Sequence, residues 1–452
     1  MLIFVAVCAL SMQLLAPYLV WRSRWNIPTH LASGFCVTAY IIPGLFTDVW
    51  LVVPDSTILR FAQINVLGAF FLIAGTFMGG HVGSRIHLPY AHIPFRIDTE
   101  SADLIKRVLF VIGVAVVGIY VAYWIMGFIP MFADDPFAAK QFKGPYREPY
   151  YRAAYLFRFC FSIIAAAMPL VLILAWSKRS PILLTLAGLA FAAIFASLAR
   201  GATATGLLVF LGVLAARSPH GLKWFIPLVL IIFPFGSTFY YTLGQLLNVQ
   251  SLTSINVGTS LSEFISAGAP DIADQLSWLY GFSRGDYFTY GRTIYGGLIP
   301  GNYEWNPSVW TISYFDVGAD ISEAVTGGLR LTTAEWGYAN FGWFGVVVIS
   351  GLSGFFNGVM LLQLKRLQPR MTTIQTTAAI LLYMTLGMQI VQFYFLSIHN
   401  LPAIAAALFF WRAAHATAGA KMRTRGQDMS VAPQPSLRRG TLMLETKDRH
   451  LR

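Results

Sequence analysis

An all-α protein that crosses a membrane many times is the fold class that this sequence predicts, from its composition, its hydropathy and the placement of its charges. Hydrophobic residues make up 56% of the 452 residues and charged residues 12%, whereas roughly a quarter of the residues in a soluble domain are charged. The mean hydropathy is +0.61. Apolar runs of about 20 residues, the length that spans a bilayer as a helix, recur along most of the chain.

About eleven of these runs are predicted to be transmembrane helices. Eight precede a long polar stretch: Met1–Val20, Leu31–Val53, Thr57–Met78, Val108–Phe128, Ala154–Trp176, Pro181–Leu198, Ala202–Ala215 and Trp224–Leu246. Three follow it: Trp336–Leu364, Thr373–Phe395 and Leu401–Ala418. The seventh run is short, and the sixth and seventh could instead form a bent hairpin around Arg200. The first run has no positive n-region and no small-residue cleavage site, so we interpret it as a retained span.

The spans divide the chain into four regions. Residues 1–246 hold spans one to eight, residues 247–335 form one long loop, residues 336–419 hold spans nine to eleven, and residues 420–452 form a basic tail. Within the loop, Leu261–Gly268 and Ile272–Tyr280 could form short helices along the membrane interface. The tail is polar and contains proline, which is typical of disorder, and its basic residues can lie against anionic lipid headgroups.

Lysine and arginine determine the predicted orientation, because they concentrate in cytoplasmic loops. If the connection that carries Arg22 and Arg24 is cytoplasmic, every second connection is cytoplasmic, and these connections hold most of the basic residues. The N-terminus and the long loop are then outside, and the C-terminus is inside. This asymmetry accounts for the net charge of +12, so no nucleic-acid partner is expected.

Sequence motifs for a nucleotide, a metal or a disulfide are absent. The chain has no Walker A loop, no G-x-G-x-x-G, no H-E-x-x-H and no G-x-S-x-G. Cys8, Cys36 and Cys160 lie in apolar runs without C-x-x-C spacing, which argues against a disulfide framework and a thiolate metal site. Three histidines between residues 81 and 92 match no metal template. We therefore expect neither a metal nor a cofactor.

Arginines gather on the predicted outer side, close to membrane depth. Arg200 closes the sixth span, Arg158 lies inside the fifth, and Arg284 and Arg292 lie in the loop. A guanidinium can hold phosphate through two parallel hydrogen bonds and stays charged at any working pH, so this cluster fits a lipid that carries pyrophosphate. Each arginine could instead pair only with an acidic residue or a headgroup. We favour binding for Arg200 and a structural role for Arg158, and both interpretations stay open for Arg284 and Arg292.

Aromatic residues are dense in the same loop and could provide platforms for sugars. The candidate sugar-binding residues are Asp286, Tyr290, Tyr295, Trp305 and Asn340. Aromatic rings can stack on the apolar faces of sugars, but they also form ordinary belts at membrane interfaces. Taken singly, the rings fit a belt better, whereas their density beside acidic and amide groups favours sugar binding modestly.

Two residues on the outer side are candidates for acid–base chemistry. Glu335 stands at the mouth of the ninth span, where it could activate a sugar hydroxyl or pair with an arginine. It could equally lie in the first turn of a helix capped by Thr332 or Thr333. His399 falls in a short outer turn and could act as a base or proton shuttle, or have no role. Glycines at 337, 342, 345, 351, 354 and 358 would let another helix pack closely.

Three segments of the chain resemble one family. Ser197-Leu-Ala-Arg-Gly201 closes a middle span, Gly291-Arg-Thr-Ile-Tyr-Gly-Gly-Leu-Ile-Pro300 lies in the loop, and Ala334–Gly345 opens a glycine-rich span. With the overall topology, they are similar to the oligosaccharide repeat-unit polymerase (O-antigen polymerase, Wzy-type) family of bacterial inner membranes. The chain departs from the family pattern at Ala334, where a glycine is commoner, and in residues 300–307, which lack the expected basic residues.

The resemblance implies a glycosyltransferase C-like fold and a polymerase on the periplasmic face of the bacterial inner membrane. Its substrate would be an oligosaccharide repeat unit linked to undecaprenyl pyrophosphate, with a chain-length regulator as a possible partner. The family's arginines map onto Arg200, Arg284 and Arg292, which would bind the pyrophosphate, and its glutamate maps onto Glu335. His399 has no family counterpart, although either it or Glu335 could lie near the acceptor hydroxyl.

Three other functions remain open. An O-antigen ligase, which hands the finished polymer to a lipid-A core, needs the same pyrophosphate site and outer loop. A transporter or flippase for the lipid-linked unit would be expected to have internal repeats and broken helices in matched positions, and no convincing pair is found. A purely structural membrane protein would leave the outer arginines unexplained.

Overall fold

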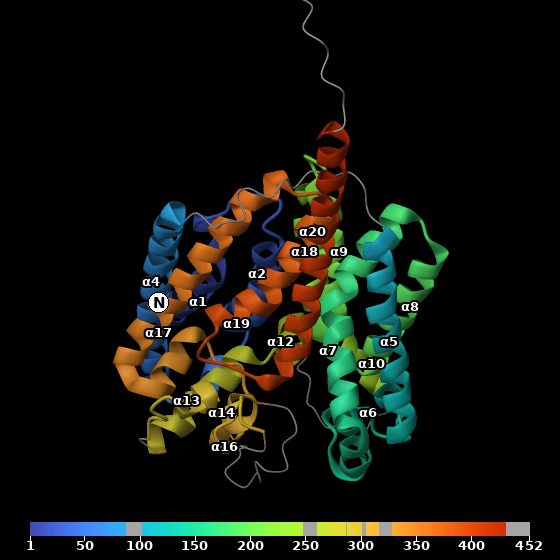
Figure 1. The fold of residues 1–452 in the computed structure, drawn as a ribbon. Coiled ribbons are helices and arrows are strands. Elements are labelled where there is room, and N and C mark those ends of the chain that lie inside the picture. Colours follow the sequence, from blue (N-terminus) through green and yellow to red (C-terminus); the bar gives the residue numbers. More distant parts are fainter. Residues whose placement is uncertain (87–101, 247–259, 286, 301–303, 316–327, 431–452) are drawn as a thin grey trace, which may run out of the picture.

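The computed structural model describes residues 1–86, 102–246, 260–285, 287–300, 304–315 and 328–430. Within these ranges every regular element is helical, as Figure 1 shows, so the predicted all-α class is confirmed. Seven helices there are long and apolar enough to cross a membrane: Leu2–Leu19, Ile27–Phe46, Asp55–Arg85, Leu104–Phe132, Gly144–Lys178, Thr333–Arg370 and Thr373–Val391. Shorter apolar helices cover Pro181–Ala196, Gly201–Arg217 and Leu222–Gly236. This is the pattern of a multi-pass membrane protein.

Although only seven described segments are long and apolar enough to cross a membrane, helices of the described chain cover at least part of every predicted span. They are α1 (Leu2–Leu15), α2 (Ile27–Cys36), α4 (Asp55–Arg85), α5 (Ala102–Met126), α7 (Arg147–Lys178), α8 (Pro181–Ala196), α9 (Arg200–Arg217), α10 (Leu222–Leu246), α17 (Thr333–Leu367), α18 (Thr373–Leu382) and α20 (Leu401–Ser430). The prediction of one span at Leu31–Val53 was wrong in its bounds. The chain there passes from α2 through a π-helical turn, η2 (Val37–Ile41), into the short α3 (Ile42–Phe46).

Helix α17 is broken near its start. Phe341 and Gly342 have non-helical backbone angles, and Gly342 has a φ of +60°, a conformation that glycine adopts without steric cost. The break folds the chain back on itself, because a Cβ on Gly345 would lie only 2.0 Å from the carbonyl oxygen of Gly337. The predicted ninth span is therefore a short helix, a sharp turn and a long helix.

The long part of α17 packs against α4 through glycines. A Cβ added to Gly354 would lie 2.1 Å from the carbonyl oxygen of Leu72, and one on Gly358 would lie 2.2 Å from that of Thr76. Gly75 on α4 meets the α17 backbone just as closely. The close helix contact expected of this glycine-rich span is thus present, and α4 supplies the partner.

The described part of the predicted loop forms five short helices. They are α12 (Leu261–Gly268), α13 (Asp271–Gly285), α14 (Arg292–Gly296), α15 (Pro307–Trp310) and α16 (Ile312–Phe315). The two helices expected in this stretch are both present, the second five residues longer than predicted at its C-terminal end. Trp278 of α13 is fully buried, with its ring 5.0 Å from that of Phe282 and 6.3 Å from that of Trp310. The described part of the loop is thus a packed layer.

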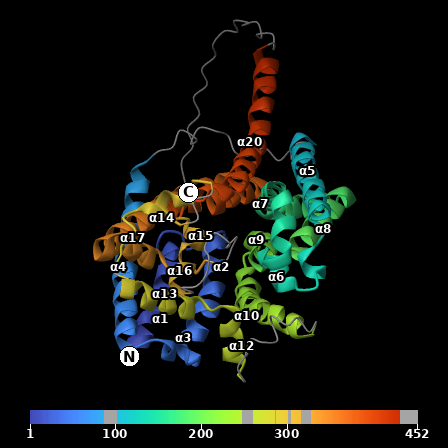
Figure 2. The ribbon, with the colours of Figure 1, turned by 90° about the horizontal axis from the view of Figure 1, so that it is seen from below.

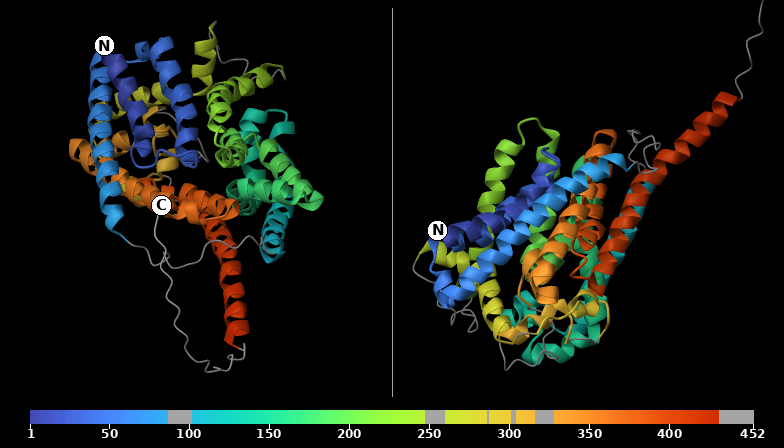
Figure 3. Two further views of the ribbon diagram at one scale, coloured as in Figure 1. Left: turned by 90° about the horizontal axis from the view of Figure 1, so that it is seen from above. Right: turned by 90° about the vertical axis from the view of Figure 1, so that its left-hand side faces the viewer.

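The loop helices and the basic C-terminal helix lie at opposite ends of the bundle. Figure 1 places α13, α14 and α16 together at one end, whereas α20 projects from the other, and Figure 3 shows this projection from two further directions. At the α20 end, Arg366 donates to the carbonyl oxygens of Gly83 and Ser84 at 3.1 and 2.6 Å. Basic residues from several connections therefore share the end away from the loop.

Two hydrophobic cores lie side by side in the bundle. One is centred on α5, α7, α8 and α9, with α18 and α20, and the other on α1, α4, α13 and the first part of α17. Figure 2 shows these two groups of helices from the loop end. The space between the two cores is where the candidate site lies.

Candidate functional site

A cavity of about 690 Å³ opens between the two cores near the loop end of the bundle. Phe157, Arg158 and Ser162 of α7 line one wall, and Asp271 of α13 lines another. Further parts of the wall come from α1, residues 328–333 and the segment before α20, including η10 (Ile398–Asn400). Elements far apart in the sequence thus meet at one hollow that contains both charged and aromatic groups.

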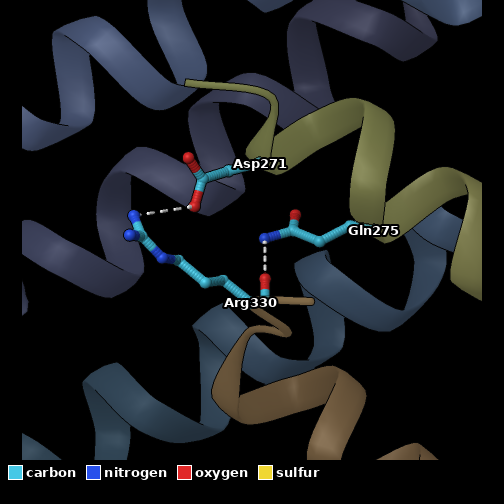
Figure 4. Close-up of polar contacts among 3 residues, drawn as sticks. All are labelled: Asp271, Gln275 and Arg330. Carbon is cyan, nitrogen blue, oxygen red and sulfur yellow. Dashed lines mark hydrogen bonds and ion pairs between the residues drawn. The ribbon is translucent and has the colours of Figure 1, made fainter. Parts of the chain in front are cut away.

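Asp271 and Arg330 form a loose ion pair on the cavity wall, drawn in Figure 4. The Asp271 side chain is 3% exposed, that of Arg330 is 74% exposed, and Nη1 lies 3.8 Å from Oδ1. The amide of Gln275 donates to the backbone carbonyl of Arg330 at 2.7 Å. The backbone of Arg330 is therefore fixed, while its guanidinium is exposed enough to contact a ligand.

Asp274 follows Asp271 by about one helical turn, so a second carboxyl group lies near the ion pair. Burial, and after it the charge of Asp271, raises the pKa of Asp274 to about 7, although Arg330 acts in the opposite direction. Like charges in a partly buried site disfavour each other's ionised form. This end of α13 is therefore an acidic pair facing one arginine.

On the other wall, Arg158 is held by two neighbours. Its Nε donates to the hydroxyl of Tyr150, and its Nη1 lies 2.8 Å from Nε2 of His399. Tyr150 is fully buried and stacks on Phe142 with ring centroids 3.7 Å apart. The guanidinium is therefore oriented by a packed aromatic support, and it lies on the cavity wall.

The protonation state of His399 follows from its contact with Arg158. A guanidinium can only donate hydrogen bonds, so Nε2 of His399 accepts and the imidazole is neutral, with its proton on Nδ1. Partial desolvation of the ring, and after it the charge of Arg158, lowers the pKa of His399 below its ordinary value. The turn itself is tied to the loop, because the Ile398 N–H donates to the Gly297 carbonyl at 3.0 Å.

Glu335 is fully buried and does not line the cavity. Its Oε2 accepts from the N–H of Thr332 at 2.7 Å, and its own N–H donates to Thr332 Oγ1 at 3.2 Å, which is a capping box. Thr332 donates onward to Oδ1 of Asn65, which also accepts from Gln13. The structure favours the capping interpretation of Glu335, with Thr332 and Gln13 as the members of this network that face the cavity.

The loop arginines lie outside the cavity wall. Arg284 and Arg292 are both exposed, and each guanidinium lies over a ring, at 4.1 Å from the centroid of Tyr280 and 4.8 Å from that of Trp305. The structure does not bring them together with Arg158. Arg200 is the first residue of α9, and its side chain lies outside the described part of the chain.

The candidate sugar-binding residues fall into two groups. Tyr290 and Tyr295 are 72% and 50% exposed on the loop surface, beside Trp305, whereas Asp286 lies outside the described residues. Asn340 is fully buried, and its Oδ1 accepts from the Gly291 N–H and from the hydroxyls of two loop threonines. Asn340 therefore orients the loop from within and is not among the residues that line the cavity.

Sequence reasoning did not single out Asp271 or Arg330 as site residues, and it favoured a structural role for Arg158. The usable signal for Arg158 was an arginine inside an apolar run, which needs a partner or a function. Asp271 and Gln275 recur at helical spacing in α13, a weak hint that they share a face. Among the described residues, no group of three His, Cys, Asp or Glu side chains could hold a metal ion.

Comparison with known proteins gives no relative for this chain. No protein-family model, no curated protein and no solved structure matches it.

Proposed function

We propose that this chain is a membrane-embedded glycosyltransferase that joins oligosaccharide repeat units carried on undecaprenyl pyrophosphate. The observation that carries the proposal is the cavity between the two cores, where Arg158 and Arg330 line the wall together with the nearly buried Asp271. This combination suits a reaction in which a pyrophosphate leaves a sugar and a hydroxyl replaces it.

The arginines would bind the leaving group. Breaking the bond between the anomeric carbon and the pyrophosphate adds negative charge to a group that is already anionic. Guanidinium donors that are oriented beforehand stabilise such charge most where water is partly excluded. Tyr150 and His399 hold Arg158 in place, so Arg158 would be the fixed donor and Arg330 the adjustable one. Arg200 stays a predicted third donor.

Asp271 would act as the base for the acceptor hydroxyl. As the hydroxyl oxygen bonds to the anomeric carbon, its proton would pass to the Asp271 carboxylate, and the electron pair of the broken bond would leave with the pyrophosphate. An arriving pyrophosphate would draw Arg330 away from its long 3.8 Å contact with Asp271. The carboxylate would then be a stronger base when the substrate is bound.

The distribution of charged residues supports the proposed orientation. Helices α13, α14 and α16 lie at the end of the bundle opposite the projecting part of α20, and residues of α13 and α15 line the cavity. Because basic residues favour the cytoplasmic side, the cavity would open toward the periplasm of a bacterial inner membrane, with the C-terminus in the cytoplasm. A chain-length regulator could then meet the protein on that periplasmic side.

The test is a gel of surface polysaccharide from a strain that lacks this gene, run beside the complemented strain. The proposal predicts that the ladder of polymer bands disappears while a lipid core with one repeat unit remains. Loss of every repeat unit from the core, with lipid-linked polymer accumulating, would instead identify a ligase. An unchanged ladder would refute both.

A further inference from the structure

A row of cationic, aromatic and hydroxyl side chains continues from the cavity along α7. Arg147, Tyr151, Tyr155, Arg158 and Ser162 are spaced by three or four residues, which puts them on one face of the helix. Arg158 and Ser162 line the cavity. The other three lead away from it toward the N-terminal end of α7, so the row, here called the α7 track, is continuous with the candidate site.

The outer part of the α7 track is open. Tyr155 is 88% exposed and Tyr151 is 39% exposed, and the guanidinium of Arg147 lies over the Tyr151 ring, 5.8 Å from its centroid. The buried side of α7 is carried by other residues, among them Ala153 and Phe157. Tyr155 and part of Tyr151 are therefore open to a ligand, whereas Arg147 also contacts its neighbours in the fold.

The length of α7 places the outer part of this track beyond the hydrocarbon layer. Its 32 residues extend about 48 Å at a rise of about 1.5 Å per residue, whereas the hydrocarbon layer is about 30 Å thick. If Lys178 lies at the basic end of the layer, Arg158 is about 30 Å away, at the opposite boundary. The turns from Arg147 to Tyr155 then lie among headgroups and water, where a sugar chain can reach them.

We propose that the α7 track binds the oligosaccharide chain of the lipid-linked substrate as it extends from the cavity. Tyrosine rings offer flat apolar faces with a polar edge, and guanidinium groups donate to hydroxyls and carboxylates. The inference rests on the proposed function, because it takes the cavity as the place where the pyrophosphate end is held. The track would keep the growing chain engaged between successive additions.

Exposed aromatic residues outside α7 provide a matched control for a simple interfacial belt. Trp124 of α5 and Phe132 of η5 (Pro130–Phe132) are 82% and 77% exposed, and neither lines the cavity. A belt that only anchors the bundle in the interface would need these rings as well as the tyrosines of the track. A glycan track needs only the tyrosines.

The first experiment compares polymer length in the deletion strain complemented with two double variants. Tyr151→Ala with Tyr155→Ala should shift the ladder to shorter chains, while Trp124→Ala with Phe132→Ala should leave it at wild-type length. Equal shortening in both strains, or wild-type length in the track variant, would overturn the inference while the polymer's dependence on the gene still supports the proposed function. A deletion strain with an unchanged ladder would remove the proposed function and this inference with it.

The second experiment detects the contact directly in the full-length protein. Benzoylphenylalanine is placed at position 155 or, as the control, at position 124, and cells that make the polymer are irradiated. Glycan should become attached to the protein only from position 155, visible as a smear above the protein band with a glycan-specific stain. Attachment from both positions or from neither would overturn the proposal.

Discussion

The seam between α4 and α17 and the cavity between the two cores join helices in opposite ways. In the seam, glycines bring backbones into contact, and a Cβ on Gly354 would lie 2.1 Å from a carbonyl oxygen. In the cavity, large polar and aromatic side chains keep the helices apart and leave about 690 Å³ between them. Glycines thus let α4 and α17 pack closely at the seam, whereas large side chains separate the helices around the cavity.

The largest expected effect is on the seam. Gly354→Ala forces a methyl group against the backbone of Leu72, which cannot move without separating the helices. We therefore expect the free energy of unfolding to fall by about 1–3 kcal/mol, the usual cost of overpacking. The measurement is the yield and thermal midpoint of monodisperse protein in detergent. Gly351→Ala is the control, because a Cβ at Gly351 meets nothing within 4 Å, and it should leave both quantities unchanged or slightly higher. Equal losses would contradict the role of the seam.

The next effect is expected on the rate of polymer formation, with the fold unchanged. Asp271→Asn keeps the shape of the side chain but removes the proposed base, so polymer formation should fall by about 10²- to 10⁴-fold. The measurement is the rate of polymer formation by purified protein in nanodiscs supplied with lipid-linked repeat units. A rate within threefold of wild type would exclude Asp271 as the base.

Asp274→Asn is the matched control for Asp271→Asn. The pKa of Asp274 is raised to about 7, so the folded state holds a proton that the unfolded chain loses near pH 4. This contribution to stability is present at low pH and is lost as the pH rises through 7. Asp274→Asn should therefore retain activity and raise the unfolding midpoint more at pH 8 than at pH 5. A larger gain at pH 5 would contradict the assigned direction.

A smaller effect is expected on the pH dependence of stability, at the part of the cavity wall where His399 contacts Arg158. The pKa of His399 is lowered, so in the folded state the imidazole is almost entirely neutral above the ordinary value of about 6.5. Below that pH the unfolded state gains the proton first, and stability is lost as the pH falls. When the pH falls from 8 to 5, the thermal midpoint should decrease less in His399→Gln than in the wild type, because the amide oxygen of glutamine can accept from Arg158 at any pH. Identical pH profiles would count against this contact.

The smallest effect is expected at Glu335. Glutamine serves the N3 position of a capping box as well as glutamate does, so Glu335→Gln should change the unfolding free energy by no more than about 1 kcal/mol and leave polymer formation nearly unchanged. The measurements are the unfolding midpoint and the nanodisc rate. A rate lowered a hundredfold would restore Glu335 to the chemistry.

Local patterns in the sequence predicted the helices well and the site only in part. Apolar runs predicted the bundle, and glycines on α17 predicted a close helix contact, because both depend on neighbours in sequence. Asp271, Arg330 and Arg158 come together from α13, the segment before α17 and α7, and no spacing in the sequence encodes that meeting. The sequence favoured a structural role for Arg158 and left binding open for Arg284 and Arg292, because it shows isolated charges only. Only the fold separates a guanidinium held on a cavity wall from one resting on an exposed ring.

The most direct test of the central claim, that the cavity is the reaction site, compares two pairs of arginines in the deletion strain. One complementing gene carries Arg158→Ala with Arg330→Ala, and the other carries Arg284→Ala with Arg292→Ala. With both proteins inserted at wild-type level, the cavity pair should abolish the polysaccharide ladder and the loop pair should retain it. A ladder that survives loss of the cavity arginines and disappears with the loop arginines would contradict the account.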